Sequence, residues 1–171
     1  MNIKLSLLAI VEILSGLSIG IVIMIITYQI LKLVGRRRYD IHEKNLAYSI
    51  FMASVLFSVG YMVSGVVQPL LSLFRIMAAT ESSTSQLLFS FLGYGAFYIA
   101  ASYTAGVVVS LVGITIYTGL TPIDEFAELK NNNLGVALIV GTIIIVLTLL
   151  TRDGVNLLME SQVPYPTHFT Q

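Results

Sequence analysis

The sequence predicts an all-α integral membrane protein whose four transmembrane helices form two parallel (tandem) two-helix repeats. Its composition, four long apolar runs and a polar signature that occurs twice lead to this fold class. Of the 171 residues, 56% are hydrophobic and 11% are charged, and the mean hydropathy is +0.89. Soluble domains contain about 25% charged residues. The chain therefore has too little polar surface to cover a water-soluble globule of its length.

Charge, cysteine content and motifs exclude several kinds of function. The formal net charge is zero and the chain has no cysteine. A nucleic-acid-binding domain carries a basic surface, so nucleic acid is not an expected partner. The lack of cysteine excludes disulfides and cysteine-ligated metals, and His42 and His168 fall on opposite sides of the membrane in the topology predicted below. The common nucleotide-binding, zinc-protease and hydrolase motifs do not occur. We therefore expect no enzyme activity, no cofactor and no metal site.

Four apolar runs are long enough to cross a bilayer. About 20 helical residues, rising about 1.5 Å each, cross the hydrocarbon core of about 30 Å. The runs cover residues of about 5–34, 46–74, 87–120 and 134–151. Pro69 lies near the end of the second run, where it is expected to kink or stop the helix.

The polar segments between the runs differ in character. Residues 75–86 are rich in Ser and Thr and are expected to form a short loop. In the third connection, Thr121 is predicted to cap a short amphipathic helix. Pro122 would take its first position, and the acid Asp124 follows three residues after the cap. The residues after 151 form a polar tail.

Basic residues predict the orientation of the chain. Lys and Arg near the ends of membrane spans favour the cytoplasmic side, and Arg36, Arg37 and Arg38 form the densest charge cluster. We therefore place connections 35–45 and 121–133 in the cytoplasm and both termini outside. The same arginines could also bind anionic lipid headgroups, which is compatible with their topogenic role.

The polar signature occurs at residues 40–47 and 128–135, and each copy leads into an apolar run. Each copy reads as an acid, an aliphatic residue, a basic-capable residue, two variable residues, Asn, Leu and a small residue. Asn133 lies 88 positions after Asn45, which predicts a duplication with a first repeat at 1–86, a second at 87–160 and a polar tail at 161–171. Asn is a good N-cap, although it could instead bond to another helix or contact a ligand. The repeated signature residues are Asp40, Asn45, Glu128 and Asn133.

Small and polar residues follow one narrow face of each span. Spans two and four align at an offset of 88 residues, and spans one and three at an offset of 90. At about 100° per residue, these residues share a sector, and small residues spaced four apart mark the contact faces of membrane helices. Part of the face could instead line a pathway or an oligomer contact. The predicted stripe consists of Gly16, Gly20, Ser49, Ala53, Gly60, Ser102, Gly106, Ser110, Ala137 and Gly141.

Two charged residues interrupt this correspondence between the halves. Glu12 stands opposite Ser102, and Arg152 stands opposite Ser64. Both are predicted at a similar depth on the contact faces. A charge inside the bilayer needs a partner, so Glu12 and Arg152 are candidates for an ion pair within one subunit or between two. Alternatively, both lie in the headgroup layer and are solvated.

The repeated element resembles the membrane proteins grouped as domain of unknown function 350. The resemblance covers residues of about 5–155, and the tail after Glu160 lies outside it. The first copy departs from the pattern at Lys44, where a small residue often precedes the Asn; the second has Asn132 there. The resemblance implies a bacterial or archaeal inner-membrane protein with two tandem repeats and no established activity. Some members are encoded beside envelope-stress and ATP-grasp-type proteins, which implies a role with membrane partners.

Two classes of function remain open from the sequence. The chain could be a membrane subunit or scaffold in envelope maintenance, with the lipid bilayer, its own copies or other membrane proteins as partners. The alternative is an oligomeric channel or a transporter of ions or small solutes. A channel would place Ser49, Gly60, Ser102 and Ser110 on a wet surface, whereas a scaffold would bury them between helices.

Overall fold

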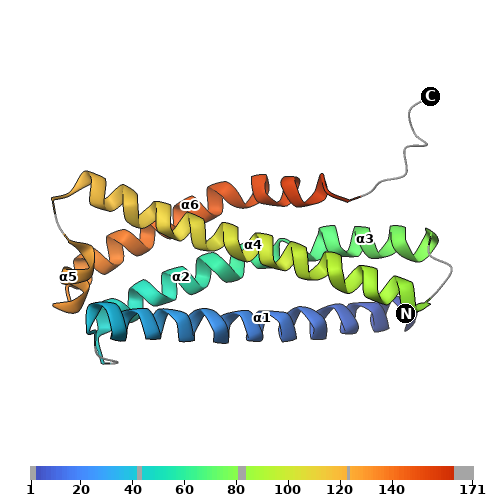
Figure 1. Ribbon diagram of the computed structural model, residues 1–171, viewed down its shortest axis with the longest axis horizontal. Helices are drawn as coiled ribbons and strands as arrows, with labels where there is room; N and C mark the ends of the chain where they lie inside the picture. Colours follow the sequence, from blue (N-terminus) through green and yellow to red (C-terminus); the bar gives the residue numbers. More distant parts are fainter. Residues whose placement is uncertain (1–2, 42–43, 81–83, 123, 164–171) are drawn as a thin grey trace.

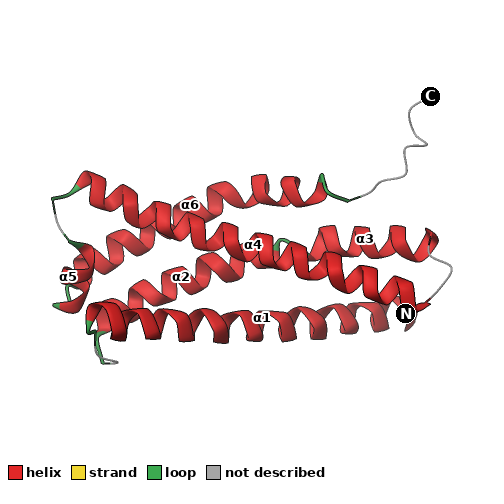
Figure 2. Cartoon of the chain, viewed as in Figure 1, coloured by secondary structure: helices red, strands yellow, loops and turns green. Residues whose placement is uncertain are grey.

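The computed structural model describes residues 3–41, 44–80, 84–122 and 124–163, and all regular structure in them is helical (Figures 1 and 2). Within these ranges, the side chains of residues 3–15, 75, 78–80, 84 and 88 are not described. The helices, in chain order, are α1 (Ile3–Tyr39), α2 (Leu46–Ser64), α3 (Val67–Thr80), α4 (Thr84–Leu120), α5 (Glu125–Lys130) and α6 (Leu134–Glu160).

Four helical segments are long and apolar enough to cross a membrane: Gly16–Tyr39, Leu46–Phe74, Ser85–Leu120 and Leu134–Glu160. Large apolar side chains remain exposed along these segments, and soluble monomeric proteins rarely expose so extensive an apolar surface. The chain therefore has the architecture of a multi-pass membrane protein. Examples of these outward-facing side chains are Leu17, Ile21, Ile25, Leu92, Leu111, Leu138 and Leu150.

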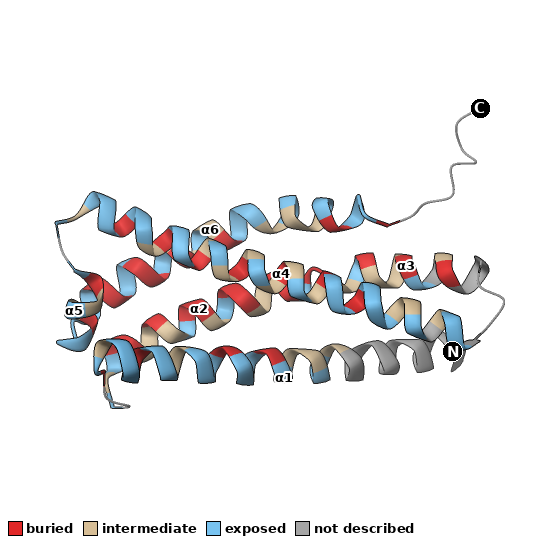
Figure 3. Cartoon of the chain, in the orientation of Figure 1, coloured by how far each residue is buried: buried red, intermediate tan, exposed pale blue. Residues whose placement is uncertain are grey.

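The second span is the centre of the bundle. Of its most apolar residues, 50% are buried, against 11% for the first span. α2 packs against α1, α4 and α6, and the buried residues concentrate where these helices face one another (Figure 3). The main core includes Phe51, Val59, Val140 and Ile144. The described part of α1, residues 16–39, therefore lies at the periphery, with most of its surface uncovered by the chain.

The second predicted span consists of two helices, α2 and α3, that meet at Gly65 and Val66. The expected kink at Pro69 begins one turn earlier, because proline has no N–H to donate and its ring clashes with the carbonyl four residues before it, here that of Gly65. The turn closes through tighter hydrogen bonds, including Val66 N–H to the Val63 carbonyl at 3.0 Å. A Cβ on Gly65 would collide with the Asn156 side chain of α6. Glycine thus permits the break to pack against α6.

The Ser/Thr-rich loop predicted at 75–86 is wrong in extent. α3 continues to Thr80 and α4 begins at Thr84. Met77, Ala78 and Ala79 are good helix formers, so α3 can continue past the end of the apolar run. Polarity therefore does not end these helices.

Two other helices also extend beyond their apolar runs. α1 reaches Tyr39, so the three arginines lie in its last turn and not in a connection. α6 continues from Thr151 to Glu160, a segment that the sequence assigned to a polar tail. Cations near a helix C-terminus stabilise it through the helix dipole, which favours the extension of α1. The apolar pattern marks the membrane-crossing part of each helix but not its end.

Candidate functional site

The two signature segments lie against each other at the α5 end of the bundle. The Asn45 side-chain Nδ2 donates to the backbone carbonyls of Leu129 at 2.6 Å and Lys130 at 3.1 Å. In return, the Ala47 N–H donates to Asn132 Oδ1 at 3.0 Å. Each segment thus satisfies backbone groups of the other, 84 to 85 positions away in the chain.

Both repeated asparagines are N-caps, as the sequence predicts. Asn45 Oδ1 accepts the Tyr48 N–H at 2.7 Å, and Asn133 Oδ1 accepts the Val136 N–H at 3.3 Å. Their amide nitrogens act differently, because Asn133 Nδ2 donates to Glu128 within its own segment at 2.8 Å. Asn45 therefore combines capping with bonding between segments, two roles that the sequence presented as alternatives.

An ion pair also joins the two segments. Lys130 Nζ lies 3.2 Å from Asp40 Oδ2, and the two side chains are 49% and 78% exposed. An exposed pair of this kind contributes at most about 1 kcal/mol. Asp40 and Asn132 have φ values of 52° and 60°. Asp and Asn adopt this left-handed conformation more readily than most residues, so both can take part in the sharp turns that bring the segments together.

α5 begins one turn later than predicted, and Asp124, not Thr121, caps it. Asp124 Oδ1 accepts the N–H groups of Phe126 at 3.0 Å and Ala127 at 3.1 Å. The Thr121 N–H and hydroxyl both donate to the Tyr117 carbonyl, so they complete the end of α4. The Phe126 ring then stacks on Tyr39 of α1, with centroids 3.9 Å apart. α5 is thereby fixed to α1 as well as to the signature segments.

Side-chain hydroxyls connect three spans in the middle of the bundle. Thr148 of α6 donates to Ser58 Oγ of α2 at 2.7 Å, and Ser58 donates to the Gly106 carbonyl of α4 at 3.2 Å. A Cβ on Gly106 would lie 2.9 Å from Val59 Cα, so α2 and α4 are in backbone contact there. Ser58 and Thr148 are fully buried. Polar groups here serve contacts between helices.

The predicted stripe divides between packed and open positions. Ser102, Gly106, Ser110, Ala137 and Gly141 are buried on α4 and α6. A Cβ on Gly141 would meet Ser54 of α2, and one on Gly60 would meet the end of Met24. By contrast, Ala53 is exposed, Ser49 is half-buried, and no described atom outside the local helix lies within 4 Å of a Cβ built on Gly16 or Gly20.

Gly16 and Gly20 therefore do not bring α1 into backbone contact with another helix among the described residues. Together with Gly60, they line an apolar groove of about 220 Å³. The physical reason is that longer side chains, such as Met24 over Gly60, separate α1 from α2. Close approach occurs on α4 and α6 instead.

Arg152 lies against α2 near the end of the bundle away from α5. Its guanidinium stands 4.1 Å from the Tyr61 ring centroid, and it donates to Tyr61 Oη at 3.1 Å and Ser64 Oγ at 3.3 Å. Its Nε is buried without a hydrogen-bond partner in the described structure. The side chain of Glu12 lies outside the described residues, so the proposed pair remains a prediction.

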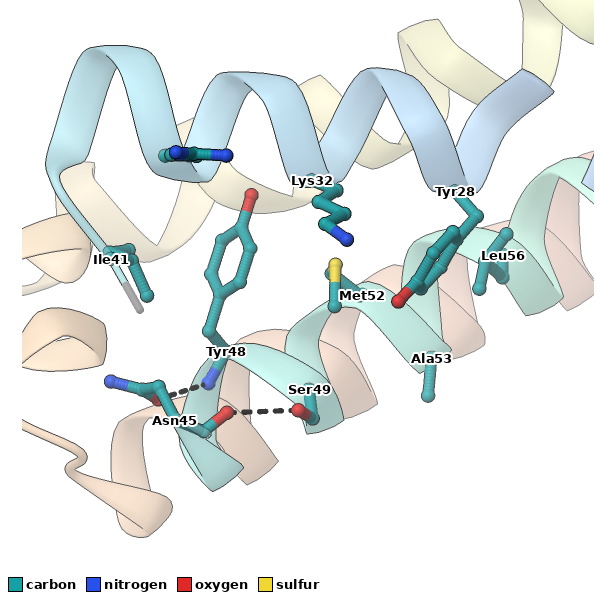
Figure 4. Close-up of a pocket in the computed structure, with 10 residues that line it drawn as sticks. Tyr28, Lys32, Ile41, Asn45, Tyr48, Ser49, Met52, Ala53 and Leu56 are labelled. Atoms are coloured by element: carbon teal, nitrogen blue, oxygen red, sulfur yellow. Dashed lines mark hydrogen bonds between the residues drawn. The ribbon is translucent and has the colours of Figure 1, made fainter. Parts of the chain in front are cut away.

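A second pocket, of about 230 Å³, opens between α1 and α2 near the α5 end (Figure 4). Its polar lining includes Lys32 and Arg36 of α1 and Asn45 and Ser49 of α2. Lys32 extends across it toward Met52. Arg37 and Arg38 are exposed on the same final turn of α1 but do not line it.

A family comparison identifies the chain. The model of the family described as Domain of Unknown Function (DUF350) matches residues 5–155. The chain belongs to the DUF350 family. No curated protein and no solved structure matches it. The resemblance carried by the repeated signature is thus confirmed, and this DUF350 protein has no matched relative from which a reaction could be transferred.

Two contributions to these sites in the DUF350 protein were not predicted from the sequence. Lys32 is not among the predicted site residues, although Tyr28, Lys32 and Arg36 are spaced four apart and therefore share one helix face. Asn132 was noted only as the residue that precedes the signature Asn133, whereas its Oδ1 accepts the Ala47 N–H of the other segment. Within the described residues, no three His, Asp or Glu side chains gather as a metal site.

Proposed function

We propose that this DUF350 protein is a non-enzymatic membrane subunit or scaffold that assembles with its own copies or with other membrane proteins in envelope maintenance. The buried hydroxyls carry the proposal. Ser102 and Ser110, which a channel would expose to water, are 0% and 3% exposed. Ser58 and Thr148 bond to one another and to α4. Ser58 and Thr148 thus hold three helices together, whereas Ser102 and Ser110 are buried between helices and away from any wet surface.

The peripheral position of α1 supports assembly. Only 11% of its most apolar residues are buried by the chain, and Gly16 and Gly20 face an open groove. In a bilayer, small residues let a second helix approach closely, and the van der Waals packing that results is one of the forces that associate helices there. A transmembrane helix from a second copy or from a partner subunit is the occupant that this face fits.

Duplication and orientation are part of the same proposal. Asn45 and Asn133 cap α2 and α6 at the same end of the bundle, and α2 and α6 pack against each other, as expected for two tandem repeats. Arg36, Arg37 and Arg38 also gather at that end. By the positive-inside tendency, we propose that it faces the cytoplasm of a bacterial or archaeal cell, with both termini outside.

Native-membrane purification followed by mass measurement of the intact assembly tests the proposal. The wild-type chain is expected as an oligomer or with a membrane partner, and Gly20→Leu is expected to dissociate it. Gly119→Leu is the matched control, because Gly119 is equally open but lies outside the groove. A wild-type monomer without partners would overturn the scaffold reading. Ion flux in liposomes that falls with Ser102→Val would favour the channel alternative.

A further inference from the structure

The pocket between α1 and α2 has a row of polar side chains along the wall that α1 forms. Tyr28, Lys32 and Arg36 all line it from α1. Residues four apart lie on the same helix face, displaced by about 6 Å along the axis. The wall therefore presents a phenol, an ammonium and a guanidinium in order toward the α5 end.

Two of these groups are available to a ligand. Tyr28 is 45% exposed and Arg36 is exposed. Among the described residues, none forms a hydrogen bond with the Tyr28 hydroxyl, and none forms a hydrogen bond or ion pair with the Arg36 guanidinium. Lys32 has an interaction of its own within the chain, so the site depends chiefly on Arg36, with Lys32 adding positive charge.

The opposite wall offers few competing partners, because its polar groups already bond within the protein. The Ser49 hydroxyl donates to the Asn45 carbonyl at 2.9 Å, and the Tyr48 hydroxyl donates to the Leu31 carbonyl at 2.6 Å. None of the described residues that line the pocket is acidic. The pocket therefore has positive charge without an acidic counter-charge in its lining.

The polarity of the pocket changes with depth. Arg36, Lys32 and Asn45 lie toward the helix ends, whereas Met52 and Leu56 lie farther along α2 toward the middle of its membrane-crossing segment. A charged entrance above an apolar floor matches the division of a lipid into headgroup and acyl chain. Guanidinium groups bind phosphate through paired hydrogen bonds, and basic residues beside a span attract anionic lipid.

We propose that this pocket binds the headgroup of an anionic phospholipid. Arg36 holds the phosphate, Lys32 adds positive charge beside it, the Tyr28 hydroxyl contacts the glycerol-ester region, and an acyl chain passes over Met52 and Leu56. A free phosphate ion would need the cations but would gain nothing from the apolar floor. The site adds lipid recognition to the proposed scaffold and does not require that the chain form oligomers.

Intact-complex mass spectrometry of the full chain in neutral detergent tests the proposal. The protein is titrated with short-chain phosphatidylglycerol, with phosphatidylcholine of the same chains, and with inorganic phosphate. Phosphatidylglycerol is expected to bind several-fold more tightly than phosphatidylcholine. Arg36→Gln should weaken the binding of phosphatidylglycerol about fivefold, because one basic residue near anionic lipid contributes about 1 kcal/mol. Arg37→Gln removes the same charge from the same helix turn outside the pocket and should leave the affinity within about twofold.

A second variant keeps every charge and tests the acyl-chain part. Ala53 is exposed in the pocket, so Ala53→Phe should obstruct the floor and weaken phosphatidylglycerol. Equal binding of the two lipids, equal losses in Arg36→Gln and Arg37→Gln, or no loss in Ala53→Phe would each overturn the proposal. Displacement of phosphatidylglycerol by millimolar phosphate would instead indicate an ion site. These outcomes are independent of oligomeric state, so failure here is distinguishable from failure of the scaffold.

Discussion

Replacement of Asn45 by Ala should destabilise the protein much more than the same change at Asn133, although the two residues are equivalent in the signature. Asn45 loses a helix cap worth about 1 kcal/mol and two hydrogen bonds to the carbonyls of Leu129 and Lys130, each worth about 1 kcal/mol. The expected loss is therefore about 3 kcal/mol. Asn133 loses its cap and one exposed bond to Glu128, for a total of about 1.5 kcal/mol.

Reversible unfolding in mixed detergent measures this difference as a change in the free energy of unfolding. Backbone hydrogen exchange gives an independent signal, because α5 should exchange faster in Asn45→Ala but not in Asn133→Ala. The comparison uses one substitution type at two capping positions, so general loss of helix capping cancels. If Asn133→Ala were as destabilising as Asn45→Ala, or if α5 exchange did not respond, Asn45 would be only a cap and the connection between the segments would be of no energetic consequence.

Three further predictions concern the membrane-crossing region. Gly106→Ala should lower the free energy of unfolding by about 1–3 kcal/mol through overpacking. The control Gly119→Ala should be neutral or slightly stabilising. Equal effects of the two changes in the same unfolding assay would contradict the backbone contact between α2 and α4. Thr148→Val should lower the free energy of unfolding by about 0.6–1.7 kcal/mol, from the average to the largest value found for hydrogen bonds between membrane helices by double-mutant cycles. An unchanged value would argue against the hydroxyl network. Assembly lost in Glu12→Arg or Arg152→Glu should return in the double variant, as measured by intact mass; a double variant no better than either single change would reject the pair.

Periodicity and polarity predicted the membrane-crossing runs but not the helix ends. Arg36, Arg37 and Arg38 continue α1, and residues beyond Thr151 continue α6, because a helix leaving an apolar region can remain hydrogen-bonded within itself. Pro69 correctly predicted that the helix of the second span is interrupted. The interruption falls at Gly65, because the proline ring clashes with the carbonyl four residues before it. Local chemistry therefore predicted the existence of these features better than their bounds.

The stripe illustrates what a single helix cannot reveal. Gly106 and Gly20 belong to the same predicted pattern, but Gly106 contacts the backbone of α2 whereas Gly20 faces an open groove. Small size permits close approach without specifying which helix approaches. Whether two helices come into backbone contact depends on the side chains between them. The Met24 side chain of α1 lies over Gly60 and keeps α1 and α2 apart there.

Composition and short motifs were enough to predict a helical chain of the DUF350 family with four potential membrane spans, two of which begin at Asn45 and Asn133. These properties depend on composition and short-range geometry, which are local. The bonds between the two signature segments, and the pocket that Tyr28, Lys32 and Arg36 line together with α2, became visible only in the folded chain. Such contacts join residues far apart in the chain, and their partners are chosen by how the helices pack.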